Sequence, residues 1–227
     1  MDWSVEGVRS LTETINGKLL PQEGEFLWGL ARKCIGRGVI VEIGSWQGRS
    51  TTWLAAGSKE GAKVRVYAID PHIRAPENAQ ILKENIKRAG VDDLVEPLVM
   101  TSAKAAESFD KPIELLFVDG DHKYEAVKSD FELWYPKLID GGTIAFHDRD
   151  SPGPRRLIEE SVRTSGHLTD LGMKVEILYA RKFLKPSLGA SWNRRIFWLR
   201  FNGEGIARKY HVPRFIQKLG AGLLKRL

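Results

Sequence analysis

The chain has 227 residues, of which 42% are hydrophobic and 28% are charged, and its formal net charge is +6. This composition is typical of a globular protein and excludes a disordered or low-complexity chain. The single cysteine, Cys34, excludes disulfide frameworks and thiolate zinc sites. The N-terminal residues lack the apolar core of a signal peptide, and no apolar run reaches the ~20 residues that span a bilayer, so we expect a cytoplasmic protein.

Strand-like and helical patterns alternate along the chain. Apolar, β-branched runs predict buried parallel strands at 38–43, 64–69, 95–100, 113–118 and 143–147. Apolar residues at helical spacing predict helices at 23–34, 50–56, 76–89, 124–138 and 155–163. This alternation predicts a mainly parallel sheet with helices on both faces and a binding crevice at the carboxyl ends of the strands.

Two more strand-like runs, 174–179 and 195–201, follow the last predicted helix, and we expect them to form an antiparallel pair at one edge. The predicted fold is therefore α/β, a three-layer Rossmann-like arrangement around a mainly parallel seven-stranded sheet. We expect an N-terminal helical cap at 1–36, a central ligand-binding domain at 37–203 and a basic amphipathic tail at 204–227.

The C-terminal part of the chain is basic. From residue 181 onward, twelve Lys and Arg residues accompany one acid, Glu204. Such a segment is compatible with peripheral contact to a membrane or another anionic partner. The alternatives are a solvated surface, or a helix packed on its own domain or on a second copy of the chain. It carries no strong signal for nucleic acid.

Acidic residues follow several predicted strands. The residues at these positions are Glu42, Asp70, Asp119 and the pair His147 and Asp148. A single carboxylate there often only caps the next helix, but acids on successive parallel strands line one crevice.

The first of these positions begins a glycine-containing turn. Gly44 and Gly48 let the backbone turn tightly and approach a ligand, although a turn of this kind that binds nothing is the alternative. Asp70, at the end of the next strand, is placed to accept hydrogen bonds from the ribose diol of a nucleoside cofactor. Alternatively, Asp70 simply begins a turn before Pro71.

The segment 115–148, LLFVDGDHKYEAVKSDFELWYPKLIDGGTIAFHD, is more distinctive. Together with VEIGSWQGRST and VYAIDPH, it resembles the class I methyltransferases that use S-adenosylmethionine (SAM) and are related to antibiotic and sugar O-methyltransferases. The resemblance covers roughly residues 39–148 and leaves both termini unmatched.

The resemblance implies a set of cofactor contacts. The residues that would surround the methionine part of SAM are Glu42, Gly44, Ser45 and Gly48. Asp70 would bind the ribose, His72 and Ser102 would lie near the adenine, and Asp119 would face the transferred methyl group. The acid that relatives usually have just before the adenine position is Thr101 here.

The resemblance also raises the question of a metal ion. Metal-dependent relatives have an aspartate at the position of Asp119, and Asp148 would be a second ligand. Two carboxylates with room for water suit Mg²⁺. His147 stands where such relatives often have an acid, so metal use remains open, and packing is the alternative role for this histidine.

Transfer of a methyl group to a hydroxyl requires a base that accepts the hydroxyl proton. Asp121 and His122 are the candidates, because the natural pKa of an imidazole, ~6.5, suits general-base catalysis at neutral pH. Their alternative role is to cap the helix that begins near Tyr124.

The sequence thus predicts a SAM-dependent methyltransferase that acts on a hydroxyl of a sugar, a glycoconjugate or a small natural product. One alternative is a non-catalytic binding module that retains the SAM fold. An NAD-dependent oxidoreductase would explain Asp70, but the GxGxxG fingerprint is absent after the first strand.

Overall fold

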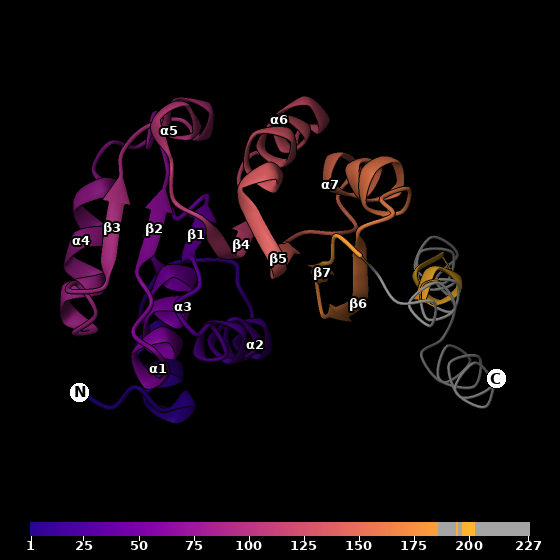
Figure 1. Ribbon diagram of the computed structural model, residues 1–227. Helices are drawn as coiled ribbons and strands as arrows, with labels where there is room; N and C mark the ends of the chain where they lie inside the picture. The colour runs from indigo at the N-terminus through magenta and orange to yellow at the C-terminus, as the bar shows by residue number, and fades with distance from the viewer. Residues whose placement is uncertain (186–193, 195–196, 203–227) are drawn as a thin grey trace, which may run out of the picture.

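The computed structural model describes residues 1–185, 194 and 197–202 (Figure 1). The tail expected at 204–227 lies outside these residues. Among the helices that are described, none has both the length and the apolar character needed to cross a membrane.

Within the described residues, the centre of the molecule is a seven-stranded sheet in the order β3-β2-β1-β4-β5-β7-β6. The strands are β1 (Val39–Ile43), β2 (Val66–Ile69), β3 (Val95–Leu98), β4 (Ile113–Val118), β5 (Leu138–Phe146), β6 (Leu168–Lys174) and β7 (Ile177–Lys182). Strands β1 to β5 pair in parallel, and β7 runs antiparallel to both β5 and β6. The predicted mainly parallel sheet with an antiparallel edge pair is confirmed.

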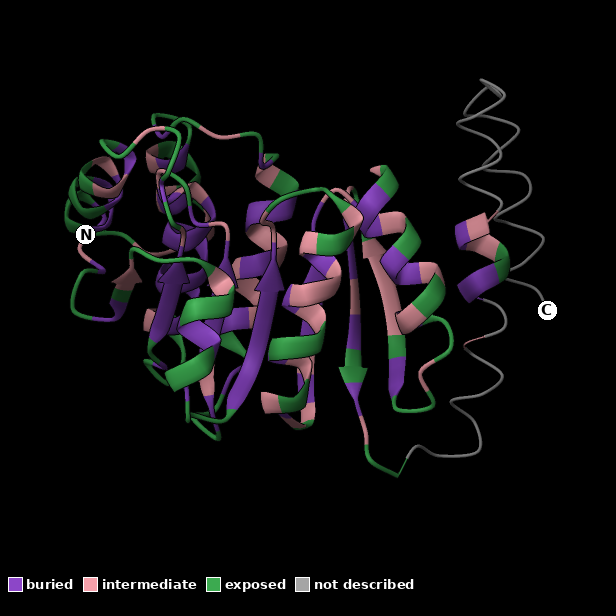
Figure 2. Ribbon diagram, turned by 90° about the horizontal axis from the view of Figure 1, so that it is seen from above, coloured by how far each residue is buried: buried purple, intermediate pink, exposed green. Residues whose placement is uncertain are grey.

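Helices cover both faces of the sheet, as the burial colours in Figure 2 show. The helices are α1 (Val5–Thr12), α2 (Pro21–Arg32), α3 (Arg49–Glu60), α4 (Asn78–Arg88), α5 (Ser102–Ser108), α6 (Tyr124–Trp134) and α7 (Pro152–Leu157), with a π-helical turn, η2 (Ile158–Val162), after α7. Apolar residues of α1 to α4 pack in one core cluster, and those of α5 to α7 pack in a second. All six residues of β4 are buried, which explains why its sequence is apolar except for Glu114.

One of the two segments predicted for the edge pair was wrong. The predicted run 174–179 overlaps β7, but its partner is β6, whereas residues 197–202 are helical. Phe197 and Phe201 lie four residues apart, one helical turn, and both are buried in the core cluster of β4 and β5. A short run of aromatic and β-branched residues therefore formed a helix because its apolar side chains share one helical face.

Helices α2 and α3 pack closely because two glycines lie at their interface. A Cβ atom on Gly24 would lie 2.2 Å from Nε1 of the buried Trp53, and one on Gly57 would lie 2.2 Å from the carbonyl oxygen of Trp28. No side chain fits at either position unless the helices separate.

We expect Gly57→Ala to lower the free energy of unfolding by about 1 to 3 kcal/mol, because the new methyl group overlaps backbone atoms of α2. Gly29→Ala is the matched control, since a Cβ atom at Gly29 meets nothing within 4 Å, and it should be neutral or stabilising by up to ~1 kcal/mol. Urea unfolding measures both. Equal stability of the two variants would contradict this view of the α2–α3 interface.

Candidate functional site

The carboxyl ends of four adjacent strands form the site. The pairing register places Ile43 opposite both Ile69 and Val118, and Val118 opposite Phe146. The residues that follow these strand ends therefore lie in one row: Gly44, Asp70, Asp119 and His147. The amide of Asp119 donates to the carbonyl of Ile43 at 2.8 Å, which extends the pairing into this row.

The glycine turn between β1 and α3 approaches the end of β4 closely. Gly44 has φ +91°, and a Cβ atom there would lie 2.1 Å from the carbonyl oxygen of Asp119. Gly48 has φ +87°, a conformation that favours glycine. An open pocket of about 290 Å³ lies beside the turn, and Gly44, Ser45, Asp119 and the segment 16–19 contribute to its wall.

Glu42, at the end of β1, is fully buried and only partly satisfied. Its Oε2 accepts a hydrogen bond from the hydroxyl of Thr51, whereas Oε1 has no hydrogen-bond partner among the described residues. Burial is the main cause that raises the pKa of Glu42 to about 7; the hydroxyls of Ser50 and Thr51 oppose the rise, and the charges of Asp119 and Asp70 add to it. The hydroxyl of buried Ser45 is likewise without a partner in that part of the chain.

Asp70, at the end of β2, accepts hydrogen bonds from two backbone amides. Its Oδ2 accepts from the amide of Trp46 at 3.0 Å, and its Oδ1 accepts from the amide of His72 at 2.8 Å. His72 is buried, and its Nδ1 lies 3.4 Å from Asp70 Oδ1. These contacts link the glycine turn to the loop after β2.

Ser102 is the first residue of α5, which the sequence analysis did not predict. Thr101 caps this helix, because its hydroxyl accepts a hydrogen bond from the amide of Lys104 at 3.2 Å. The hydroxyl of Ser102 accepts from the indole of Trp134 at 2.7 Å. Its side chain thus joins α5 to α6, and its backbone remains as the part able to contact a ligand.

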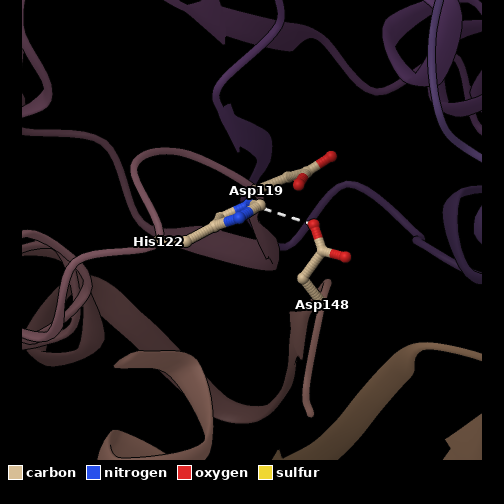
Figure 3. Close-up of side chains that lie close together, drawn as sticks. All are labelled: Asp119, His122 and Asp148. Atoms are coloured by element: carbon tan, nitrogen blue, oxygen red, sulfur yellow. Dashed lines mark ion pairs between the residues drawn. The ribbon is translucent and has the colours of Figure 1, made fainter. Parts of the chain in front are cut away.

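Asp119, His122 and Asp148 come together at the ends of β4 and β5 (Figure 3). One potential ligand atom from each lies within 4.8 Å of the others, and Nε2 of His122 is 3.0 Å from Oδ2 of Asp148. Two carboxylates and an imidazole are a plausible ligand set for a divalent cation. Asp148 has φ +48°, so its backbone is held in a conformation that residues with a side chain rarely adopt.

Asp121 lies beside this group, but its side chain makes a hydrogen bond within its own turn. Its Oδ1 accepts a hydrogen bond from the amide of Lys123 at 3.0 Å, just before α6 begins. The side chain of His122 in the same turn is about half exposed. The structure therefore places His122, rather than Asp121, in direct contact with the strand-end carboxylates.

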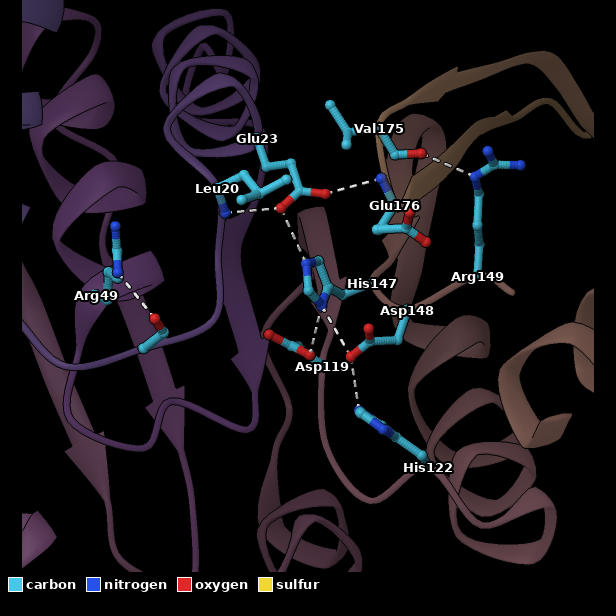
Figure 4. Close-up of polar contacts among 11 residues, drawn as sticks. Leu20, Glu23, Arg49, Asp119, His122, His147, Asp148, Arg149, Val175 and Glu176 are labelled. Atoms are coloured by element: carbon cyan, nitrogen blue, oxygen red, sulfur yellow. Dashed lines mark hydrogen bonds and ion pairs between the residues drawn. The ribbon is translucent and has the colours of Figure 1, made fainter. Parts of the chain in front are cut away.

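His147 is buried among three carboxylates (Figure 4). Its Nδ1 lies 3.2 Å from Asp119 Oδ1 and 3.1 Å from Asp148 Oδ2, and its Nε2 lies 3.2 Å from Glu23 Oε2. Burial opposes the charged ring, but hydrogen bonds to these three acids prevail and raise the pKa of His147 to about 12. The three surrounding carboxylates therefore favour the charged form of the ring.

The acids respond to this cation in different ways. Burial raises the pKa of Asp119 in spite of the opposing effect of His147. The hydrogen bond from His147 lowers the pKa of Asp148, which is less buried. Asp148 is thus the carboxylate of the pair that stays charged most readily.

Glu23 is the residue of this cluster that the sequence analysis missed. It lies in α2, and 124 positions separate it from His147. The one local signal is its place near the start of a predicted helix, which indicates only a capping acid.

The central part of the chain is similar to known proteins. A family model described as a methyltransferase domain matches residues 41–149. A catechol O-methyltransferase of Mycobacterium tuberculosis is 37% identical over 128 residues, which cover 56% of this chain and 54% of that protein. An uncharacterized protein of Acanthamoeba polyphaga mimivirus is 30% identical over 48% of this chain and 50% of its own length. The chain spans about half the length of these curated relatives.

A solved structure shares the fold. The O-methyltransferase from Bacillus cereus, in complex with S-adenosylhomocysteine (SAH), superimposes with a TM-score of 0.61 at 22% identity and covers 80% of this chain and 92% of its own. The matched region holds the glycine turn, Asp70 and the Asp119–Asp148 segment described above. Residues 41–149 therefore match a methyltransferase domain, and the chain shares its fold with an O-methyltransferase that binds SAH.

Proposed function

We propose that the protein transfers the methyl group of SAM to a hydroxyl of a small-molecule acceptor. The observation that carries this proposal is Oε1 of Glu42, a buried carboxylate oxygen without a partner among the described residues, beside the glycine turn. A buried acceptor of this kind stays costly until a donor reaches it. The ammonium group of the methionine part of SAM is such a donor.

The remaining cofactor contacts follow from the row of strand ends. Gly44 and Gly48 leave room for the cofactor backbone, and the free hydroxyl of Ser45 faces the same pocket. The carboxylate of Asp70, which already orders the turn, would receive the ribose diol. His72 and Ser102 would border the adenine. Exposed Val99 and Met100 follow β3, next to β2, and would offer the ring an apolar surface.

Catalysis would take place at Asp119, His122 and Asp148. The acceptor oxygen must lose its proton as it attacks the sulfonium-bound methyl carbon in line. His122 is the base we propose, because it is accessible to solvent and Asp148 orients its Nε2. Asp121 would fix the turn that carries His122. Close placement of acceptor and methyl group would itself lower the barrier by several kcal/mol.

Two of these side chains, Asp119 and Asp148, would hold a Mg²⁺ ion through their hard oxygen ligands. His122 lies beside them and would remain free to act as the base. When bound, the ion would lower the pKa of the acceptor hydroxyl. His147 occupies the position of an acid in metal-dependent relatives and neutralises part of the carboxylate charge.

The acceptor we propose is a hydroxyl of a sugar, a glycoconjugate or a small natural product. Support for a small acceptor comes from the name of the M. tuberculosis relative, a catechol O-methyltransferase. Residues 1–36 would then be a cap over the site and 37–203 the SAM-binding domain, with 204–227 as an appended tail. The pocket wall formed by 16–19 supports the role of the cap.

Cofactor binding should release a proton from Glu42. With a pKa of about 7, Glu42 is protonated in about half of the molecules at pH 7. The ammonium group of SAH favours the charged carboxylate, so binding lowers this pKa and expels the proton. We expect about half a proton released per SAH bound at pH 7, and less as the pH rises above 7 and Glu42 is already charged before binding. Calorimetric titrations in phosphate and in Tris, which differ in ionisation enthalpy, measure this release.

The matched variant for this experiment is Glu42→Gln, which has no proton to release. Its binding heat should be the same in both buffers, and its affinity for SAH should be lower by about tenfold or more. Because folding raises the pKa of Glu42 above 4.5, its stabilising contribution is complete below pH 4.5 and is lost as the pH rises through about 7. The variant without ligand should therefore be more stable than the wild type above pH 7. Equal heats for the wild type in both buffers would contradict the assignment.

Substitution of the proposed catalytic residues should lower turnover and leave cofactor affinity nearly unchanged. We expect His122→Ala and Asp119→Asn each to lower the rate of methyl transfer by about 100-fold or more, with SAH affinity within about twofold of wild type. Initial rates with radiolabelled SAM, and catechol and a panel of glycosides as acceptors, measure turnover. His167→Ala is the control, because this exposed histidine precedes β6, beside Phe183 and far from the strand ends of the site. Full activity in both site variants would overturn the assignment.

A further inference from the structure

A buried carboxylate from the N-terminal part of the chain reaches the reaction centre. Oε2 of Glu23 accepts a hydrogen bond from the amide of Leu20 at 2.9 Å and lies 3.2 Å from Nε2 of His147. Its Oε1 accepts from the amide of Glu176 at 2.8 Å. One carboxylate therefore joins the start of α2, the residue after β5 and the turn between β6 and β7 (Figure 4).

Capping of α2 alone does not account for this placement. Glu23 is 0% exposed, and burial of a charged carboxylate costs several kcal/mol unless the charge is paired. Glu25, in the same helix, remains partly exposed and pairs with Arg9 at the surface. Glu23 instead extends inward to the one imidazole that contacts two carboxylates of the site.

The orientation of His147 determines the geometry of those carboxylates. Its Nδ1 lies 3.1 Å from Asp148 Oδ2 and 3.2 Å from Asp119 Oδ1, while its Nε2 lies 3.2 Å from Glu23 Oε2. Rotation of the ring would break contacts on both sides at once. Asp148 in turn lies 3.0 Å from His122, so the contacts form a continuous series from α2 to the proposed base.

We infer that Glu23 is a positioning residue for methyl transfer: through His147 it orients Asp119 and Asp148 toward the acceptor and the metal ion. This inference rests on the proposed function, because it assigns Glu23 a role in that same site. It makes the N-terminal helix a part of the reaction centre as well as its cover. Residues that orient metal or substrate ligands in this way typically contribute 10- to 100-fold to affinity or activity.

The test compares Glu23→Gln with Glu25→Gln, a charge-neutralising change in the same helix. A glutamine at position 23 is uncharged and has one acceptor oxygen for the donors at Leu20, His147 and Glu176, so the contact with the ring is lost or weakened. Three quantities are measured at one pH: SAH affinity by calorimetry, Mn²⁺ affinity with SAH bound, and the NMR signals of the His147 ring N–H groups. Melting temperatures identify any variant that does not fold, and Glu23→Asp, which keeps the charge, then replaces Glu23→Gln.

We expect Glu23→Gln to shift or broaden the ring signal of Nδ1–H and to weaken Mn²⁺ binding by about 10- to 100-fold, with SAH affinity within about twofold of wild type. Glu25→Gln should change none of these. In a His147→Asn background, Glu23→Gln should have no further effect on Mn²⁺ affinity, because the two residues act as one unit. A purely structural role would instead lower the melting temperature and both affinities together.

Failure of this inference is distinguishable from failure of the proposed function. An unchanged Nδ1–H signal and unchanged Mn²⁺ affinity in Glu23→Gln overturn the role of Glu23, whatever the wild type binds. If the wild type binds no SAH, the proposed function is wrong, and Glu23 has no role in methyl transfer. If the wild type binds SAH but no Mn²⁺, only the proposed metal site is wrong, and the ring signal then tests the role of Glu23.

Discussion

The buried contact of His147 with Glu23, Asp119 and Asp148 is the interaction on which the site depends. Three carboxylates so close together would repel one another strongly, and burial increases that repulsion. The imidazolium between them makes their approach favourable and ties α2, β4 and β5 together at one point. The sheet brings the strand ends into a row, and the ring of His147 reduces the repulsion between the acidic side chains that lie there.

Glu42 shows the opposite arrangement a few residues away in the same row. No cation of the described residues reaches its Oε1, and its raised pKa reflects that lack. The site thus combines a cluster of acids whose charge His147 partly neutralises with an acid that has a free oxygen. Such a division would suit the proposed cofactor enzyme, because the proposed catalytic groups would be fixed before the cofactor binds, whereas the cofactor pocket would gain its full stability only upon binding.

Much of the fold could be predicted from sequence because burial on both faces leaves a strong local pattern. The run VIVEI of β1 and the run IELLFV of β4 are continuous in apolar character except for their single acids, and parallel pairing brings their ends together. The acids Glu42, Asp70 and Asp119 were therefore identified by position alone. One strand of the edge pair was assigned to the wrong segment because Phe197 and Phe201 satisfy strand and helix patterns alike.

The role of Glu23 could not be predicted in the same way. Its partners His147 and Glu176 are far away in the chain, and only the docking of α2 on the sheet brings them together. A capping acid and a buried acid also look the same in sequence. Ser102 shows a second limit of the sequence analysis. Its hydroxyl accepts a hydrogen bond from the indole of Trp134 in α6, a contact that the sequence does not reveal.

The close approach of α2 and α3 at Gly57 restricts how the pocket can open. Helices in such tight backbone contact move as one rigid body, so α2 does not act as a swinging lid over the cofactor. The wall of the pocket also includes residues 16–19, between α1 and α2, and a hydrogen bond from Arg49 to the carbonyl of Gly17 at 2.8 Å holds this segment to the start of α3. Under the proposed function, this hydrogen bond would keep residues 16–19 in place beside the cofactor.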